Sequence, residues 1–423
     1  MTSDAVPEKW RHLRPQTIDV LRMRKFHDPR EDPYGAVAPP VAGITGDVYT
    51  SIAYVFRNAD EAAATFSGAP GARDYAYSRI RCGQPPLEEL RQRLLDLELG
   101  EDCPERERYD VVLTSSGMSA IFLLALQFAD QCRTIITSPR LYGGSYHLLK
   151  QKLPRLGIRC HMVRDPLQLD DWRSALRERE DVAFLFAEDD ANPKPIKLDN
   201  AGIAAVAHEH GTFYVCDRTI GTPVLEQPLL TGTDIVVHSL SKNIGGRSGA
   251  LGGAIIGRKE LVHQMSDKDN GWFACTGMVM DGRTADYMLA GARDLKERME
   301  KKGKAVQRVV QFLQSHPHVA AVHHTAADVL AFEVRGNAED AARAVEAFRL
   351  ILMAPHLGDI RTLSIPPAST THSPMSPEDR LKHGITDNLI RLSIGLEDPE
   401  DIIDDLRQAL DGSWLGSKPR TSP

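Results

Sequence analysis

The chain has few cysteines for its 423 residues, and no two of them form a CxxC pair. Scattered single thiols match neither a zinc site nor a disulfide framework, so we expect reduced cysteines, no metal site and a cytoplasmic protein. The sequence also lacks an apolar run long enough to cross a membrane, and its start, MTSDAVPEKWRHLRPQ, is too polar for a signal peptide. The cysteines are Cys82, Cys103, Cys132, Cys160, Cys216 and Cys275.

Positive charge is not in excess either. The formal net charge is −7, and no basic cluster is interleaved with aromatic residues, so we expect no nucleic-acid partner. No GxGxxG motif follows the first expected strand and no GxxxxGK[ST] motif occurs, so dinucleotide and nucleoside-triphosphate binding lack support. With 42% hydrophobic and 26% charged residues, the composition is that of a globular protein long enough for two domains.

Short apolar runs alternate with helical patterns through the first two thirds of the chain. This alternation predicts an open, mostly parallel α/β sheet, whose ligands bind beyond the carboxyl ends of the strands. The expected helices cover residues 87–97, a segment from Ser115–Met118 to Phe128, and 201–209. The expected strands cover residues 111–114, 133–138, 160–163, 182–187, 212–216, 235–237 and 251–256.

Three regions differ in pattern. Residues 1–73, rich in Arg, Asp, Pro and Gly, are expected to form an arm without a compact helical unit that contacts a neighbouring subunit. Residues 74–282 are expected to form the α/β domain, and residues 283–423 a smaller C-terminal α+β domain. The smaller domain would contain one long helix from Arg283 to about Gln314, strands at 319–322, 329–334 and 388–394, and helices at 338–348 and 399–410.

The stretch DIVVHSLSKNIGGRSGALGG, residues 234–253, contains the most informative lysine. An apolar strand breaks into Ser239-Leu240-Ser241-Lys242 and is followed by small residues. Burying an ammonium group without a partner is costly, so Lys242 is not a core residue. It is either a solvated loop lysine or a lysine that forms a Schiff base, with Ser239 and Ser241 holding a phosphate beside it.

Other polar residues stand at strand ends and suggest a flat, phosphorylated ligand. Asp217 ends an apolar strand and could cap a helix or hold a cationic ring nitrogen. Gly117 lies where a strand turns into a helix, so a phosphate could approach its backbone. Tyr142 could pack in the core or stack on an aromatic cofactor. Asn192 could set a turn before proline or donate to a cofactor oxygen.

Arg391 lies inside the apolar run LIRLS. An arginine in that setting needs an anionic partner, and the carboxylate of a substrate would be a natural bidentate one.

Together these segments resemble the Cys/Met-metabolism family of pyridoxal-5′-phosphate (PLP) enzymes. Members include cystathionine γ-synthase, cystathionine γ-lyase, cystathionine β-lyase and methionine γ-lyase. The matching motifs stand in unbroken order between about Tyr75 and Leu410. They are Tyr77-Ser78-Arg79, Ser115–Met118, Tyr142–Tyr146, the segment from Glu188 to Pro193, Asp217-Arg218-Thr219, His238–Lys242 and Arg391–Ile402.

The resemblance implies an aminotransferase-like large domain of fold type I and PLP as the cofactor. Lys242 would form the Schiff base and carry protons, Asp217 would pair with the ring nitrogen, and Tyr142 would stack on the ring and assist proton transfer. The other cofactor-binding residues would be Gly117, Met118, Asn192, Thr219, Ser239, Ser241 and, from a neighbouring subunit, Tyr77 and Arg79. The substrate pocket would contain Arg391, Thr362 and His356.

The resemblance also implies the reaction and the assembly. We expect elimination at Cβ or Cγ, or replacement at Cγ, on an L-amino acid, with a dimer as the minimal active unit and usually a tetramer. A non-catalytic or regulatory PLP-binding relative and a transaminase-like enzyme are the alternatives.

Some positions depart from the family pattern. Arg218 replaces the family's asparagine, Arg247-Ser248-Gly249 replaces its HSD, and the NPT after YSR is missing. In the segment His356–Leu363, His356 replaces a serine and Arg361 an acidic residue. These departures leave the cofactor residues intact and point to an unusual γ-substituted substrate, as in a specialised biosynthetic pathway.

Overall fold

The computed structural model describes most of the chain after residue 84 and parts of the region before it. The described residues are 7–11, 31, 41–45, 47–48, 51, 53–67, 69, 71–72, 85–129, 133–267, 269–373 and 375–414.

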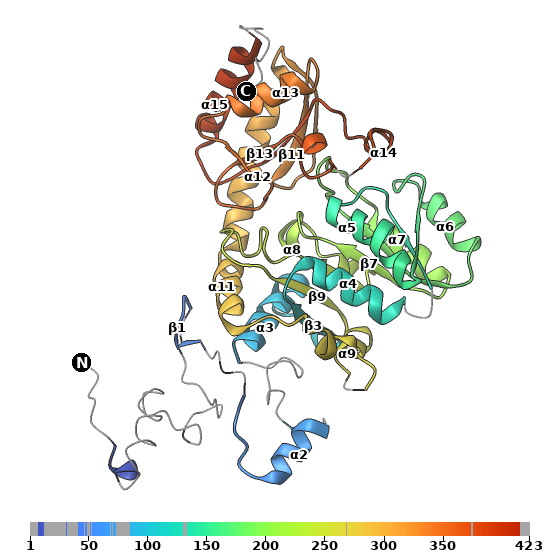
Figure 1. The fold of residues 1–423 in the computed structure, drawn as a ribbon, viewed down its shortest axis with the longest axis vertical. Helices are drawn as coiled ribbons and strands as arrows, with labels where there is room; N and C mark the ends of the chain where they lie inside the picture. Colours follow the sequence, from blue (N-terminus) through green and yellow to red (C-terminus); the bar gives the residue numbers. More distant parts are fainter. Residues whose placement is uncertain are drawn as a thin grey trace.

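A seven-stranded sheet forms the centre of the larger part of the molecule (Figure 1). The strand order is β3-β9-β8-β7-β6-β4-β5, and every neighbouring pair is parallel except the two pairs that include β9. The predicted, mostly parallel α/β sheet is therefore confirmed. The strands are β3 (Tyr109–Thr114), β4 (Thr134–Thr137), β5 (Arg159–Met162), β6 (Val182–Glu188), β7 (Tyr214–Asp217), β8 (Ile235–His238) and β9 (Gly253–Arg258).

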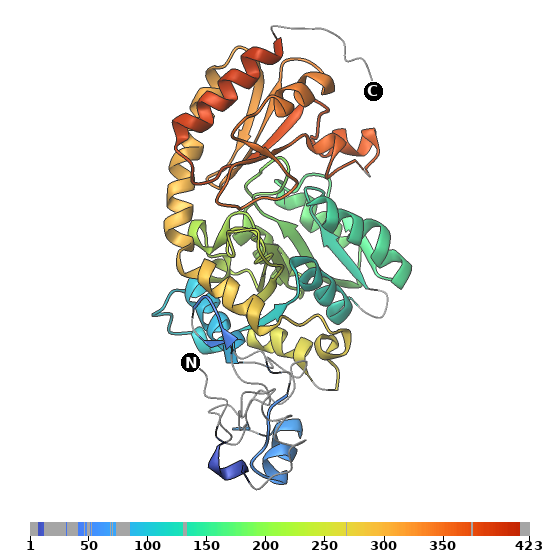
Figure 2. The ribbon, with the colours of Figure 1, turned by 60° about the vertical axis from the view of Figure 1, so that its left-hand side comes forward.

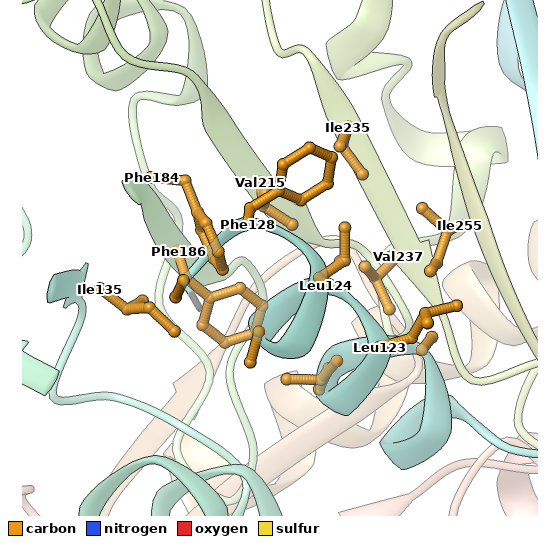
Figure 3. Close-up of a cluster of buried hydrophobic side chains, with 14 of the residues drawn as sticks. Leu123, Leu124, Phe128, Ile135, Phe184, Phe186, Val215, Ile235, Val237 and Ile255 are labelled. Carbon is orange, nitrogen blue, oxygen red and sulfur yellow. The ribbon is translucent and has the colours of Figure 1, made fainter. Parts of the chain in front are cut away.

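Helices cover both faces of this sheet, which explains why its central strands β6, β7 and β8 are buried along their whole length. On one face, Leu123, Leu124 and Phe128 of α4 (Gly117–Phe128) pack against strand residues that include Phe186 and Val237 (Figure 3). Alternate strand residues point to the opposite face. That face is covered by α3 (Pro85–Leu99), α6 (Leu169–Arg177), α7 (Asn200–Glu209) and α11 (Gly282–Arg293).

A second, five-stranded sheet lies at one end of the molecule, and α12 (Leu295–Ser315) runs alongside both parts (Figures 1 and 2). The strand order of this second sheet is β10-β11-β14-β13-β12. Apolar residues of α12, α13 (Ala338–Glu346) and α15 (Pro399–Trp414) form its core. The strands are β10 (Val319–His324), β11 (Val329–Val334), β12 (Leu352–Met353), β13 (Leu363–Ile365) and β14 (Leu389–Ser393).

The predicted single helix from Arg283 to Gln314 is wrong, because α11 and α12 are separated at Asp294. The buried Arg298 side chain donates to the carbonyl of Gly291 at 2.6 Å and to that of Asn243 at 2.7 Å. In a continuous helix, the Gly291 carbonyl would accept from the backbone four residues later. A tertiary contact therefore replaces one helical hydrogen bond.

The N-terminal region also differs in detail from expectation. It contains the helix α2 (Ala59–Ser67), which its proline- and glycine-rich composition did not predict. The limits predicted for the arm and the two domains, and the contact of the arm with another subunit, stay predictions for a single chain. Of the helices in the described ranges, none has the length and apolar character needed to cross a membrane.

Candidate active site

The sheet brings several predicted cofactor residues to one edge. Glu188 and Asp217, the last residues of β6 and β7, are register partners, and Asp217 in turn pairs with Val237 of β8. Ser239 follows directly after β8. The carboxyl ends of neighbouring parallel strands are where such sheets bind ligands, so this edge is the candidate site.

Gly117 allows the start of α4 to lie against Ser239, at the start of the loop that follows β8. A Cβ atom at this position would lie 2.7 Å from Cβ and 2.9 Å from Cα of Ser239, so any side chain here would force the two segments apart. The backbone N–H of Ser239 donates to Oγ1 of Thr219 at 2.8 Å. Free N–H groups of a first helical turn, with hydroxyls beside them, make a cradle that suits a phosphate.

Lys242 lies beyond this cradle and is mostly buried. Burial, and then the charge of Arg391, lowers the pKa of its amine to about 8. Its Nζ atom lies 2.9 Å from Nδ1 of His356. A lowered pKa leaves more of the amine neutral near neutral pH, and the neutral amine is the form that attacks a carbonyl group.

Asp217 is buried, and its carboxylate is held by Thr219. Burial raises the pKa of Asp217, whereas hydrogen bonds from the Thr219 hydroxyl (2.6 Å) and backbone N–H (3.0 Å) oppose this shift. A cationic ring nitrogen beside the carboxylate would favour its ionised form.

Glu188 is a site residue that sequence reasoning missed as an individual contributor. Its carboxyl oxygens accept from the backbone N–H groups of Tyr142 (2.5 Å) and Asn192 (3.0 Å), so it holds both loops. Burial, and then the charge of Asp217, raises the pKa of Glu188. The only sequence signal was the acidic residue at the start of the motif that ends in Asn192-Pro193.

Arg391 on β14 is fully buried (0% exposed) without an acidic partner among the described residues. Its guanidinium donates to the backbone oxygen of His356 at 2.9 Å and to Oδ1 of Asn192 at 3.3 Å. Its Nε atom is buried without a hydrogen-bond partner. Burial lowers its pKa to about 10. A buried cation with a free donor fits an anionic ligand such as a carboxylate.

The remaining predicted residues are placed differently. Tyr142 exposes 42% of its surface, and its ring lies over Gly144, where a Cβ atom would be 2.5 Å from the ring. Met118 is half-buried in the first turn of α4. The hydroxyl of Ser241 is engaged with the backbone of Gly252.

Four further residues named in the sequence analysis remain, and the structure describes two of them. Thr362 is buried, and its hydroxyl is engaged by Glu397 and Gly395 within the smaller part of the molecule. Arg361 has a side chain that is 65% exposed. The predictions for Tyr77 and Arg79 lie outside the described residues.

A buried ion cluster behind Asp217 was also missed. Arg218, 1% exposed, pairs with Asp189 at 2.8 Å and with Asp190, both of them buried. Lys197 pairs with Asp189 at 2.5 Å. The sequence signal was the run Glu188-Asp189-Asp190 combined with arginine at a position where the family has asparagine.

These residues fit PLP. Lys242 has a lowered pKa, and Asp217 supplies a carboxylate that could pair with the ring nitrogen. Gly117 leaves space for a phosphate, and Arg391 is buried with an unused donor. A cavity of about 870 Å³ lies elsewhere, along β3 between α3 and α9 (Lys259–Ser266), and none of the predicted site residues lines it. The candidate site is therefore chosen by the chemistry of its residues rather than by the size of a cavity.

Comparisons with known proteins support PLP as the cofactor. Residues 28–411 match the family described as Cys/Met metabolism PLP-dependent enzyme. L-methionine gamma-lyase from Fusobacterium nucleatum subsp. polymorphum is 33% identical over 396 residues, which cover 89% of this chain and 94% of that protein. O-succinylhomoserine sulfhydrylase from Pseudomonas aeruginosa is 30% identical over 382 residues, covering 86% and 90%.

A solved structure from Campylobacter jejuni is also similar. It is 32% identical, has a TM-score of 0.77, and the match covers 86% of this chain and 94% of that one. That protein carries N′-pyridoxyl-lysine-5′-monophosphate.

Proposed function

This chain belongs to the Cys/Met metabolism family of PLP-dependent enzymes, and on that premise we propose which residues hold the cofactor, the substrate and the moving protons. It is a PLP-dependent enzyme that acts on an L-amino acid by elimination or by γ-replacement. The observation that carries the residue assignment is that two residues contact His356: Lys242, whose amine has a lowered pKa, and the buried Arg391, whose Nε atom has no hydrogen-bond partner.

Lys242 is the covalent anchor and the main proton carrier. When bound, PLP supplies an electron-accepting ring that stores the charge left by loss of the α-proton. With a pKa of about 8, the amine of Lys242 is partly neutral near neutral pH, so it can take a proton from one carbon and return it at another. Asp217 would hold the ring nitrogen, and Tyr142 would cover the ring face.

The phosphate and carboxylate have separate anchors. Gly117, Thr219 and Ser239 would hold the phosphate at the start of α4, with Met118 and Ser241 beside them. Arg391 holds the substrate carboxylate, and Asn192 positions that guanidinium through its side-chain oxygen. A substrate held in this way would have its Cα–H bond near Lys242, which is the requirement for proton removal.

We further propose that the substrate is a γ-substituted amino acid smaller than cystathionine. His356 places an imidazole ring 2.9 Å from Lys242, where a serine would leave more space. Because Arg361 is largely exposed, the proposal rests on His356 alone. We expect kcat/KM for methionine or O-acylhomoserines to exceed that for cystathionine by more than about tenfold, the result of a contact difference of about 1.4 kcal/mol.

Product analysis across this panel, including γ-halogenated amino acids, tests the substrate proposal. Keto acid and ammonia indicate elimination, and a thioether formed with added thiol indicates replacement. His356→Ser is the matched variant, and it should improve cystathionine relative to the others. Equal turnover of cystathionine and the best substrate, with no change of ranking in His356→Ser, contradicts the proposal.

We propose a dimer as the minimal active unit, in which Tyr77 and Arg79 serve the neighbouring subunit's site, and a tetramer of two such dimers. Chains with Lys242→Ala and chains with Arg79→Ala should each be inactive. Mixing them after dissociation should restore activity, up to about a quarter of the wild-type value for random pairing, since one of two sites in half of the dimers is complete. Activity is measured in the dimer and monomer fractions after separation by size. No recovery of activity in the mixture, or a fully active monomer, refutes this assignment.

A further inference from the structure

A charged residue interrupts the apolar face of α12. Met299, Val306 and Val310 recur at helical spacing on the buried side of this helix, which runs alongside both parts of the molecule (Figure 2). Lys302 occupies a position on the same side and is fully buried (0% exposed). A buried ammonium group is costly unless it is paired, so the surrounding structure has to compensate this charge.

Asp328, which directly precedes β11, supplies the compensating charge. Its carboxylate is also fully buried, and Nζ of Lys302 donates to Oδ2 of Asp328 at 3.0 Å and to Oδ1 of Asn243 at 2.9 Å. Burial lowers the pKa of Lys302, and the charge of Asp328 opposes this shift. Arg298, which lowers this pKa, and Asp359, which raises it, act on Lys302 with opposite signs. Lys302, Asp328 and Asn243 therefore form a buried polar triad.

The hydrogen bonds of Asp328 connect this triad to the strand that carries Arg391. Oδ1 of Asp328 accepts from Nδ2 of Asn243 at 2.7 Å, and Oδ2 accepts from Lys302 and, at 3.4 Å, from the hydroxyl of Ser393. Ser393 lies two residues after Arg391 on β14, so their side chains are on the same face of the sheet. The carboxylate of Asp328 is therefore on the face to which Arg391 points, and its oxygens are already engaged.

Asp328 also acts on Arg391 through its charge. Burial lowers the pKa of Arg391, and the charge of Asp328 opposes this shift. Among the described residues, the guanidinium donates to backbone oxygens and to Asn192 rather than to this carboxylate. A carboxylate near the guanidinium would repel an anionic ligand of Arg391, and this repulsion is strong in a buried site unless another charge cancels it. Lys302 is the cation that is placed to cancel it.

We propose that Lys302 is a positioning residue for the substrate carboxylate, and that it acts by neutralising Asp328 beside Arg391. With Lys302 present, the buried groups Lys302, Asp328 and Arg391 carry one net positive charge, which a bound carboxylate balances. Without it, Asp328 and Arg391 already balance each other, and a bound carboxylate would add an uncompensated negative charge. This inference rests on the proposed function in taking Arg391 as the anchor of the substrate carboxylate.

Four variants test the charge of Lys302. Lys302→Met removes the charge and keeps an unbranched side chain. Lys302→Gln removes the charge but keeps a donor toward Asp328, and it serves the same comparison if Lys302→Met does not fold. Lys302→Met combined with Asp328→Asn removes both charges and restores the net charge of the wild type. Lys301→Met is the matched control, because Lys301 lies on the same helix but is exposed and pairs with Glu297.

The first measurement is the binding of methionine without its amino group, a carboxylic acid that is not turned over. Calorimetric titration of the PLP-loaded enzyme with this acid and with its uncharged amide separates charge from shape. We expect Lys302→Met and Lys302→Gln to weaken binding of the acid about tenfold and binding of the amide by less than about twofold. The combined variant should bind the acid within about threefold of the wild type, and Lys301→Met should match the wild type.

Three results of this titration overturn the inference. They are an equal change for acid and amide, an unchanged affinity for the acid in the Lys302 variants, and no recovery in the combined variant. A purely structural role of Lys302 predicts the last result, because the combined variant removes two buried polar groups instead of one.

The second measurement is steady-state kinetics with the best substrate of the panel. Lys302→Met should raise KM about tenfold with kcat within about twofold of the wild type, because a charge that acts on the carboxylate affects ground state and transition state alike. The combined variant should restore KM, and the Lys301→Met control should change neither constant. A lower kcat with an unchanged KM contradicts the proposed role.

Arg391→Gln distinguishes failure of this inference from failure of the site assignment. If Arg391→Gln binds the acid as tightly as the wild type, Arg391 is not the carboxylate anchor, and both the assignment and this inference are wrong. If Arg391→Gln weakens binding of the acid but the Lys302 variants match the wild type, only the role of Lys302 is wrong.

Discussion

Lys242→Ala is expected to lower turnover by at least about a thousandfold. Loss of the amine removes both the covalent attachment of PLP and the group that moves the α-proton, and a positioned acid or base alone contributes about 10²–10⁴-fold. Lys197, which follows β6 at the same sheet edge, is held by ion pairs with Asp189 and Glu226. Reduction with borohydride should fix PLP on Lys242 in the wild type and leave the variant unlabelled at this position.

Lys301→Ala is the matched control for this experiment. Lys301 is exposed and forms an i,i+4 ion pair with Glu297 at 2.7 Å, which contributes only a few tenths of a kcal/mol. The control should keep both turnover and the label. Substantial activity in Lys242→Ala, or a label on the same peptide after the change, contradicts the assignment of Lys242.

Arg218→Asn is expected to lower the free energy of unfolding by about 3–5 kcal/mol. The substitution leaves the carboxylates of Asp189 and Asp190 buried without the guanidinium that compensates them, and breaking one side of a buried ion pair costs this amount. Lys197 offsets only part of this loss, because its side chain is half exposed and also pairs with Glu226. The thermal midpoint of the PLP-loaded enzyme measures the effect.

Two further variants show whether charge or packing causes that loss of stability. Combining Arg218→Asn with Asp189→Asn and Asp190→Asn removes all three charges and should recover most of the lost stability. Arg308→Asn breaks an exposed pair with Glu400 and should cost at most about 1 kcal/mol. A combined variant that is no more stable than Arg218→Asn would show that packing, rather than charge, explains the role of Arg218.

The sequence predicted the larger sheet well because local signals define it. All seven strands lie within a few residues of their expected ranges, since most of them are short apolar runs that end at small or polar residues. The same rule placed Asp217 and Ser239 at neighbouring strand ends, where the structure has them. Where a strand is buried on both faces and ends sharply at polar residues, the sequence alone is sufficient to locate the strand and the residues at its end.

Features that depend on contacts between distant segments were not predictable. At the break at Asp294, the Arg298 side chain donates to the carbonyl of Gly291 in α11 and to that of Asn243 after β8, and no helical pattern records these contacts. Lys242 and His356 are 114 positions apart in the chain, so their contact required the fold. The short strands β12 and β13 have too few residues for a periodic signal.

The close approach at Gly358 has a consequence for recombination between relatives. The loop that follows β8 and carries Ser239 and Lys242 belongs to the larger sheet, whereas Gly358 and Arg391 belong to the smaller part. The backbone of Gly358 packs directly against the backbone of this loop at Asn243. A hybrid chain that exchanged the two parts at α12 would keep both hydrophobic cores but would form this seam from unmatched loops. A hybrid enzyme should therefore keep the substrate preference of a parent only when the loops that carry Lys242 and His356 both come from that parent.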